Sequence, residues 1–385
     1  MFESLSHLAL QQYWWLIISV LASLLVFLLF VQGGQTMLYT LARNEKERTM
    51  IINSLGRKWE FTFTTLVTFG GAFFASFPLF YSTSFGGAYY VWMLILFCFV
   101  IQAVSFEFRT KPANFLGART YETFLFINGL LGTVLLGTAV GTFFTGSEFS
   151  IDKMNLTKLY SSAISRWETP YYGLEAVLDL RNVMLGLAVF FLARVNGILY
   201  LMNSIDDENI RSRGKKYLLY NMVPFLIAFL TFVISIFLSN GFAYDANTKI
   251  VFLEPYKYFR NMIEMPLVGI MFLIGVVLVL YGIGRTLLQT FYKGIWFSGL
   301  GTVLTVISLF LITGYNKTAF YPSTFNLQHS LTIENASSSH YTLTVMSYVS
   351  LAVPFVILYI YYAWRAIDKT KITAAEMEEN ENHLY

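Results

Sequence analysis

One carboxyl group and two hydroxyl groups are spaced so that they could pass protons into a membrane. Glu60 follows the basic pair Arg57-Lys58 at the start of an apolar segment, and Thr64 and Thr68 follow at intervals of four residues. On a helix these three side chains lie on one face over roughly 12 Å, at about 1.5 Å per residue. A carboxyl group at a water boundary can take up protons, and hydroxyl groups with intervening water can relay them. The spacing therefore predicts a proton entry at Glu60, with Thr64 and Thr68 along the path.

The same residues also fit a purely structural interpretation. Glu60 could cap its helix or pair with Lys58. Threonine in a membrane helix often donates its hydroxyl hydrogen to the carbonyl four residues earlier. The pattern alone leaves both interpretations open.

Three further charged residues are candidates for structural ion pairs. Glu107 and Arg109 close an apolar segment, where pairing at the membrane edge is the default expectation. Arg194 is the one lysine or arginine near the middle of an apolar segment, and a charge at that depth needs a partner or water. We expect Arg194 to pair with Glu107, with Glu122 or with another subunit, rather than to act in catalysis.

The chain offers little to hold a haem or a metal. A haem buried among helices needs an axial His, Met or Cys at membrane depth. All four histidines fall outside the apolar segments: His7, His329, His340 and His383. The methionines and Cys98 within the segments are expected to be packing residues. We therefore expect no catalytic residue, haem ligand or metal ligand in this chain, although the first three histidines could reach a cofactor at the outer surface.

These side chains lie on or beside apolar runs that the composition assigns to a membrane. Of the 385 residues, 56% are hydrophobic and 13% are charged, whereas soluble chains carry about 25% charge. Runs of roughly 20 apolar residues match a hydrocarbon core of about 30 Å. We expect an all-helical, multi-pass membrane protein with about nine spans. The predicted spans are 14–41, 60–80, 89–107, 123–145, 183–203, 217–239, 266–287, 295–315 and 343–364.

The distribution of lysine and arginine predicts the orientation. One set of alternate loops, with the C-terminal tail, is rich in these residues, and the opposite set is poor in them. Because basic loops stay in the cytoplasm, we expect residues 1–13 outside, one membrane domain over 14–364, and an acidic cytoplasmic tail over 365–385. The net charge of +3 is not concentrated in one patch and gives no case for nucleic-acid binding.

Several short motifs, in order and with matching spacing, resemble one family. They are Trp14-Trp15, Trp59-Glu60, Gly70-Gly71-Ala72, Phe77-Pro78, Phe106-Glu107-Phe108-Arg109, Pro322-Ser323, Asn335-Ala336-Ser337 and the terminal Leu384-Tyr385. Together they resemble subunit II of the cytochrome bd-type quinol oxidases. The resemblance covers nearly the whole chain.

This resemblance implies a fold, a partner and a reaction. The fold would be two four-helix bundles plus one peripheral helix. The partner would be subunit I, which carries haem b and the quinol site in a heterodimer of the bacterial cytoplasmic (inner) membrane. The complex would oxidise quinol and reduce oxygen to water in aerobic respiration. The resemblance leaves open whether haem d accompanies haem b, and whether a structural quinone or small accessory subunits bind beside the membrane lipids.

The resemblance also bears on the proton path. The family assigns the carboxylate that matches Glu60 to a proton route toward subunit I. Trp59 precedes it in the same motif, so the resemblance adds Trp59 to the predicted proton path. The family's first-span Asp-Gly-Phe-Asp reads Gln32-Gly33-Gly34-Gln35 here, so no role of those carboxylates carries over. Two alternatives stay open: a purely structural scaffold for subunit I, and, with less support, a secondary transporter. The prolines that would break spans in a transporter do not recur in matching positions.

Overall fold

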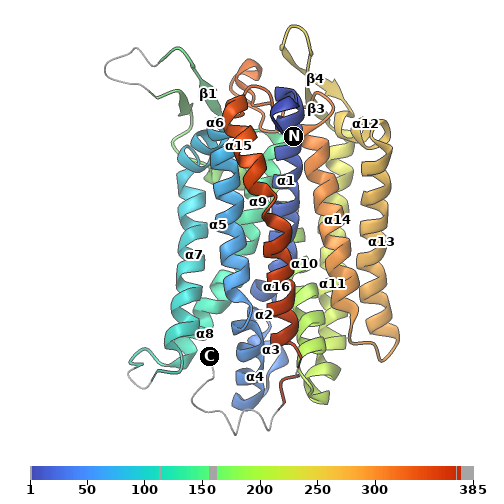
Figure 1. Ribbon diagram of the computed structural model, residues 1–385. Helices are drawn as coiled ribbons and strands as arrows, with labels where there is room; N and C mark the ends of the chain where they lie inside the picture. The colour runs from blue at the N-terminus through green and yellow to red at the C-terminus, as the bar shows by residue number, and fades with distance from the viewer. Residues whose placement is uncertain (1, 112–113, 156–162, 370, 374–385) are drawn as a thin grey trace.

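The computed structural model of the protein describes residues 2–111, 114–155, 163–369 and 371–373. Within these residues, nine helical stretches run side by side along one axis (Figure 1). They are α1 (His7–Leu28) with α2 (Phe30–Gln35), α5 (Trp59–Ser76), α7 (Tyr89–Phe108), α8 (Ala118–Ile127) with the π-turn η3 (Asn128–Gly132) and α9 (Thr133–Thr145), α10 (Leu180–Ser204), α11 (Glu208–Leu238), α13 (Pro266–Leu288), α14 (Gly294–Gly314), and α15 (His340–Ser350) with α16 (Val353–Ile367).

Eight of these stretches are long and apolar enough to cross a membrane, which confirms the all-helical, multi-pass architecture. The ninth is α5, which is 18 residues long and carries Glu60 and four threonines within an otherwise apolar helix. The helix with the candidate proton residues is therefore the one stretch of the nine that falls short of the apolarity expected of a membrane span. The predicted acidic tail beyond residue 373 lies outside the described residues.

In chain order the described helical stretches form two consecutive groups of four and one peripheral stretch. One group contains α1, α5, α7 and α8–α9, and the other contains α10, α11, α13 and α14. The groups meet where α10 packs on α2 and α9, and where α1 packs on α14. The α16 helix lies on the outside of this junction and buries none of its residues (Figure 1).

Small residues set the closest helix contacts. A Cβ atom added at Gly301 of α14 would lie 2.5 Å from the carbonyl oxygen of Gly275 in α13. A Cβ atom at Gly33 would lie 2.0 Å from the carbonyl carbon and oxygen of Ala193 in α10. Because helices in a membrane associate largely through close packing, these glycines are places where a larger side chain would separate two helices.

The connecting elements gather at the two ends of the bundle. The end with η1 (Phe2–Ser4) also holds the antiparallel pair β1 (Phe149–Ile151) and β2 (Ser165–Trp167), and the hairpin β3 (Asn240–Tyr244) and β4 (Val251–Pro255) (Figure 1). The same end holds α6 (Pro78–Tyr81), η2 (Ser82–Gly86), η5 (Leu174–Leu178), α12 (Lys257–Glu264) and η6 (Leu327–His329). The opposite end holds α3 (Leu38–Leu41) and α4 (Glu45–Gly56) (Figure 1).

Candidate functional site

The first turn of α5 is positioned by a buried lysine. Lys58 occupies the N-cap of α5 and is fully buried. Its Nζ lies 3.0 Å from Asp368 Oδ1 and 4.5 Å from the centroid of the Trp364 ring at the end of α16. Trp364 Nε1 donates to Asp368 Oδ2 at 2.6 Å. Burial lowers the pKa of the Lys58 ammonium, and the neighbouring Asp368 carboxylate offsets part of that effect.

Glu60, Thr64 and Thr68 lie on one face of α5, and all three are exposed on the surface of this chain. Lys58 pairs with Asp368, so the Glu60–Lys58 ion pair, one of the two structural interpretations of Glu60, is not formed among the described residues. Thr68 Oγ1 donates to Thr64 O at 2.8 Å, as the structural interpretation predicted for threonine. Its oxygen can still accept a hydrogen bond.

Trp59 points away from this face. It is 8% exposed, and its ring stacks on Phe106 of α7 with centroids 5.9 Å apart and planes at 14°. On the same side of α5, Thr62 Oγ1 donates to Leu28 O at 3.1 Å. The structure thus brings Glu60, Thr64 and Thr68 together and places Trp59 in the packing between α5 and α7.

A buried ion cluster joins three elements at the same end of the bundle. Arg109 Nη2 lies 2.9 Å from Glu122 Oε1 and 2.7 Å from Glu45 Oε1. Arg48 binds the same carboxylates, at 2.7 Å from Glu45 and 3.6 Å from Glu122. Glu122 is fully buried, whereas Glu107 is exposed on another face of α7. Arg109 therefore pairs with Glu122 and Glu45 rather than with Glu107, because residues two apart on a helix do not face each other.

Arg194 is not paired with Glu107 or Glu122 in the described part of the chain. Its Nη2 lies 3.1 Å from Met37 Sδ, and its guanidinium carbon lies 5.3 Å from the centroid of the Phe190 ring. Glu122 is already bound by two arginines. Pairing of Arg194 with another subunit stays a prediction.

Buried amides occupy the interior beside this cluster. Gln32, Gln35, Gln102 and Asn128 are fully buried, and Gln32 Nε2 donates to Gln102 Oε1 at 3.2 Å. Gln32 and Gln35 stand where the resemblance leads one to expect carboxylates. The sequence alone showed only that two expected carboxylates are replaced by amides at these positions. Both glutamines are buried, and Gln32 bonds to Gln102, so this part of the interior is polar but uncharged. The signal in the sequence was two polar residues in the second half of an apolar run.

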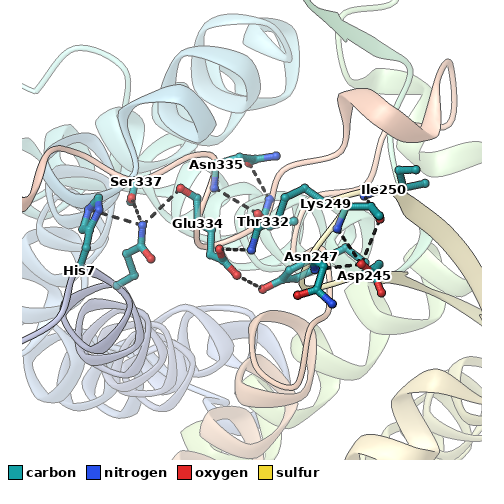
Figure 2. A network of polar contacts seen from close by, with 12 residues as sticks. His7, Asp245, Asn247, Lys249, Ile250, Thr332, Glu334, Asn335 and Ser337 are labelled. Atoms are coloured by element: carbon teal, nitrogen blue, oxygen red, sulfur yellow. Dashed lines mark hydrogen bonds and ion pairs between the residues drawn. The ribbon is translucent and has the colours of Figure 1, made fainter.

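At the opposite end, a polar network ties three segments together (Figure 2). Glu334 accepts a hydrogen bond from Tyr244 Oη at 2.7 Å and pairs with Lys249 Nζ at 2.7 Å. The backbone oxygen of Glu334 accepts from Gln11 Nε2 of α1 at 3.3 Å. Partial burial of Glu334 works to raise its pKa, but the bonds from Lys249 and Tyr244 outweigh it, so the pKa lies below its ordinary value.

The histidines of the described region lie in this same end of the molecule. His7 Nε2 is 3.0 Å from Ser338 O, and His340 Nε2 is 3.0 Å from Leu5 O. The two rings lie 6.0 Å apart; His7 is exposed and His340 is half-buried. The described residues contain no group of three or more His, Cys, Asp or Glu that could hold a metal ion.

Two neighbouring cavities lie inside this half of the bundle. One has a volume of about 390 Å³ and a polar lining that includes Glu175, Asn182 and Tyr321. The other, of about 100 Å³, is lined almost wholly by apolar side chains such as Leu25 and Leu136. Trp92 lines both cavities, so a polar chamber near the end of the bundle adjoins an apolar one deeper inside.

Comparison with known proteins agrees with this architecture. Residues 10–367 match the family model described as cytochrome bd terminal oxidase subunit II. The chain is 27% identical, over 97% of both sequences, to the cytochrome bd-I ubiquinol oxidase subunit 2 of Escherichia coli. It is 26% identical to the cytochrome bd ubiquinol oxidase subunit 2 of Bacillus subtilis, over 93% of this chain and 96% of that one.

A similar fold occurs in a solved structure. A chain of the bd oxidase from Geobacillus thermodenitrificans superposes with a TM-score of 0.64 at 14% sequence identity. The match covers 94% of this chain and all of the other. At this identity the likeness concerns the fold.

Proposed function

The chain belongs to the cytochrome bd terminal oxidase subunit II family, and from this premise we propose that it works as the second subunit of a bacterial quinol oxidase. The complex would oxidise membrane quinol and reduce oxygen to water in aerobic respiration. The observation that carries this proposal is the match of the family model over residues 10–367, together with relatives that are named as ubiquinol oxidase subunits over nearly their whole length.

We assign electron transfer to the partner, subunit I. Haem b, with or without haem d, supplies that chemistry when bound there. Among the described residues, His7 and His340 do not fit a haem at membrane depth, because both lie at the end of the bundle with ring nitrogens against backbone oxygens. The chain is expected to have no activity without its partner.

The role that we propose for this chain is proton delivery beside its scaffold role. Glu60 would take up protons from the cytoplasm, and Thr64 and Thr68 would guide them along α5. All three are exposed in the isolated chain, so a partner surface must complete any such path. Because the hydroxyl hydrogen of Thr68 is bonded to Thr64 O, its part in a relay needs water on its oxygen or rotation of the hydroxyl. Trp59 would keep the first turn of α5 in register through its stack on Phe106.

The same exposed face supports an assignment of the docking surface. Val67, Gly71 and Phe74 continue the row of Glu60, Thr64 and Thr68 along α5, with Val67 58% and Phe74 61% exposed. A Cβ atom added at Gly71 would meet nothing within 4 Å, so another helix could approach closely there. We therefore place subunit I along α5, with the proton path in the interface.

We propose the bacterial cytoplasmic membrane as the location, with the N-terminus outside. The elements with many basic residues, including α4, lie at one end of the bundle, and the long loops lie at the other (Figure 1). The positive-inside rule then puts Glu60 at the cytoplasmic edge. Orientation can be checked by labelling single cysteines introduced at exposed positions of the two ends in intact cells.

A structural quinone is a second proposed ligand. The polar cavity of about 390 Å³ would take a ring with oxygen substituents, and the adjoining apolar cavity of about 100 Å³ would take the first part of an isoprenoid chain. Extraction of the purified complex with organic solvent, followed by mass spectrometry, would detect such a quinone. Blocking the cavity with Asn182→Phe should remove it while subunit I remains bound.

The decisive experiment compares Glu60→Gln with a matched control, Glu107→Gln, in the purified complex. Both variants remove an exposed carboxylate near the cytoplasmic end of a helix, but only Glu60 faces the proposed path. Glu60→Gln should slow quinol-driven oxygen uptake roughly 10-fold or more, as expected for loss of a proton-transfer group. The haem spectrum should stay unchanged, because no haem is bound by this residue.

The alternatives make different predictions. If the chain is only a scaffold, Glu60→Gln and Glu107→Gln will both turn over like the unmodified complex. If it is a secondary transporter, the chain purified without a partner will move a solute across vesicles. A reduced-minus-oxidised spectrum without haem bands in the co-purified complex would contradict the oxidase assignment itself.

A further inference from the structure

Arg194 carries a charge inside the membrane domain that the described part of the chain does not neutralise. It lies 14 residues after the start of α10 and 10 residues before its end, or about 15 Å from that end at 1.5 Å per residue. A cation at this depth costs several kcal/mol unless an anion or water reaches it. No carboxylate of the described residues lies within ion-pair distance, since Glu122 is held by Arg109 and Arg48.

The contacts of Arg194 leave most of its guanidinium free. Nη2 reaches only the sulfur of Met37, a weak acceptor, and the ring of Phe190 lies 5.3 Å away. Nε is buried without a hydrogen-bond partner. A thioether and an aromatic ring solvate a cation partly but supply no negative charge. The guanidinium therefore keeps unused N–H donors in the fixed planar arrangement that suits an anion with two oxygens.

An anion can reach this position from the lipid side. Leu187, Phe191 and Arg194 follow one another at spacings of four and three residues, so they share a face of α10, and each is only half-buried. The residues after Arg194, 195–202, are all buried. The α10 helix packs against α9, α2 and α11. We infer that this half-buried row lies in a seam between α9 and α11, with Arg194 at the end of the seam that adjoins Met37.

This end of the seam lies close to the lipid headgroups. Met37, which contacts Arg194, comes two residues before Tyr39, so their Cα atoms are at most about 7.6 Å apart. Tyr39 in α3 is 43% exposed, and the Arg48 guanidinium lies 5.8 Å from the centroid of its ring. An exposed tyrosine beside an arginine at the end of a helix bundle is typical of the membrane interface. A lipid phosphate at the level of Tyr39 would therefore lie near the Arg194 guanidinium.

We propose that Arg194 binds the phosphate of an anionic phospholipid from the cytoplasmic leaflet, whose acyl chains lie in the seam between α9 and α11. Two N–H groups of the guanidinium would donate to two phosphate oxygens. A lipid fits this seam better than a helix of another protein, because the only other side chains on the row are the apolar Leu187 and Phe191. The exposed row on α5 is broader and is better suited to contact with a partner helix. The site needs only this chain in a membrane and does not depend on oxidase activity.

The test counts phospholipids retained by the purified complex. The complex is transferred to mild detergent, mixed with phosphatidylglycerol or phosphatidylcholine, and analysed by native mass spectrometry. Arg194→Gln should retain one phosphatidylglycerol fewer and bind it roughly 10-fold more weakly, and Arg194→Lys should fall between the two. Arg285→Gln is the matched control, because Arg285 lies in the last turn of α13 and already contacts Tyr281 and Gln289.

Three results would overturn the proposal. Equal retention of phosphatidylglycerol by Arg194→Gln and Arg285→Gln would show that Arg194 holds no lipid. Displacement of the lipid by inorganic phosphate alone would assign the site to a free anion. Release of subunit I from Arg194→Gln with an unchanged lipid count would assign the guanidinium to a carboxylate of the partner. Normal oxygen uptake by Glu60→Gln, with the lipid still retained, would contradict the proposed function and leave this site in place.

Discussion

The contact between Lys58 and Asp368 allows a quantitative test of how α16 is held. The α16 helix buries none of its residues, so its attachment depends on its end, where Trp364 and Asp368 meet Lys58. Lys58 is fully buried, and the Asp368 side chain is 20% exposed. Asp368→Ala would leave a buried ammonium without its carboxylate and the Trp364 indole without an acceptor.

The magnitude follows from these two losses. Breaking a buried ion pair by removing one partner costs about 3–5 kcal/mol, and partial exposure of Asp368 favours the lower end. The lost indole hydrogen bond adds about 1 kcal/mol. We expect Asp368→Ala to lower the free energy of unfolding by about 3–4 kcal/mol. Lys58→Met should cost less, about 1–2 kcal/mol, because the remaining carboxylate can reach water.

The double variant separates an ion pair from packing. Lys58→Met with Asp368→Ala leaves no unpaired charge, so it should be more stable than Asp368→Ala alone by at least about 1 kcal/mol. The assay is denaturant titration of the purified complex in mild detergent, followed by tryptophan fluorescence, with protease cleavage of the chain end as a second probe. A change of less than about 0.5 kcal/mol in the free energy of unfolding of Asp368→Ala would show that the buried pair does not hold α16. The same conclusion would follow if the effect of the double variant equalled the sum of the two single effects.

Three further predictions concern other contacts. Glu122→Gln should lower the free energy of unfolding by about 3 kcal/mol, since Arg109 keeps only the exposed Glu45, and equal denaturation curves would contradict this. The lowered pKa of Glu334 means that its contribution, about 1 kcal/mol, is present above the unfolded value near 4.5 and is lost as pH falls through the folded value. The stability of Glu334→Gln should therefore meet that of the unmodified protein at low pH, and a constant difference would refute the assignment. Gly301→Val should separate α13 from α14 and reduce the yield of folded complex, whereas Gly284→Ala, with nothing within 4 Å of the added Cβ, should not.

The sequence was sufficient for the number and type of the long elements. Runs of about 20 apolar residues cannot expose their backbone to lipid, so they must be helices wherever they occur. This argument needs no knowledge of neighbours, and it located α10, α13 and α14 within a few residues of their observed bounds. It was less accurate where some helices begin: the predicted 14–41 covers most of α1 and all of α2 and α3, but α1 begins at His7, and α11 begins at Glu208 rather than near 217.

Only part of the candidate site could be predicted by the same reasoning. Helical spacing correctly placed Glu60, Thr64 and Thr68 on one face, because three residues on one helix need only its period. The same reasoning could not tell that this face is exposed in the isolated chain, or that Trp59 packs on Phe106 on another side. Nor could it find the partners of Lys58 and Arg109, which come from residues far along the chain.

Composition and periodicity thus determined that this protein is a bundle of membrane helices and which side chains share a helical face, since both properties depend on the local chain and on the lipid around it. The tertiary structure decided which charges meet: Lys58 pairs with Asp368 and Glu122 pairs with Arg109, whereas Arg194 contacts Met37 and Phe190. The physical reason is that ion pairing depends on distances of a few ångströms between separate helices. Those distances are set by how small residues such as Gly33 and Gly301 let the helices approach, and not by any one segment alone.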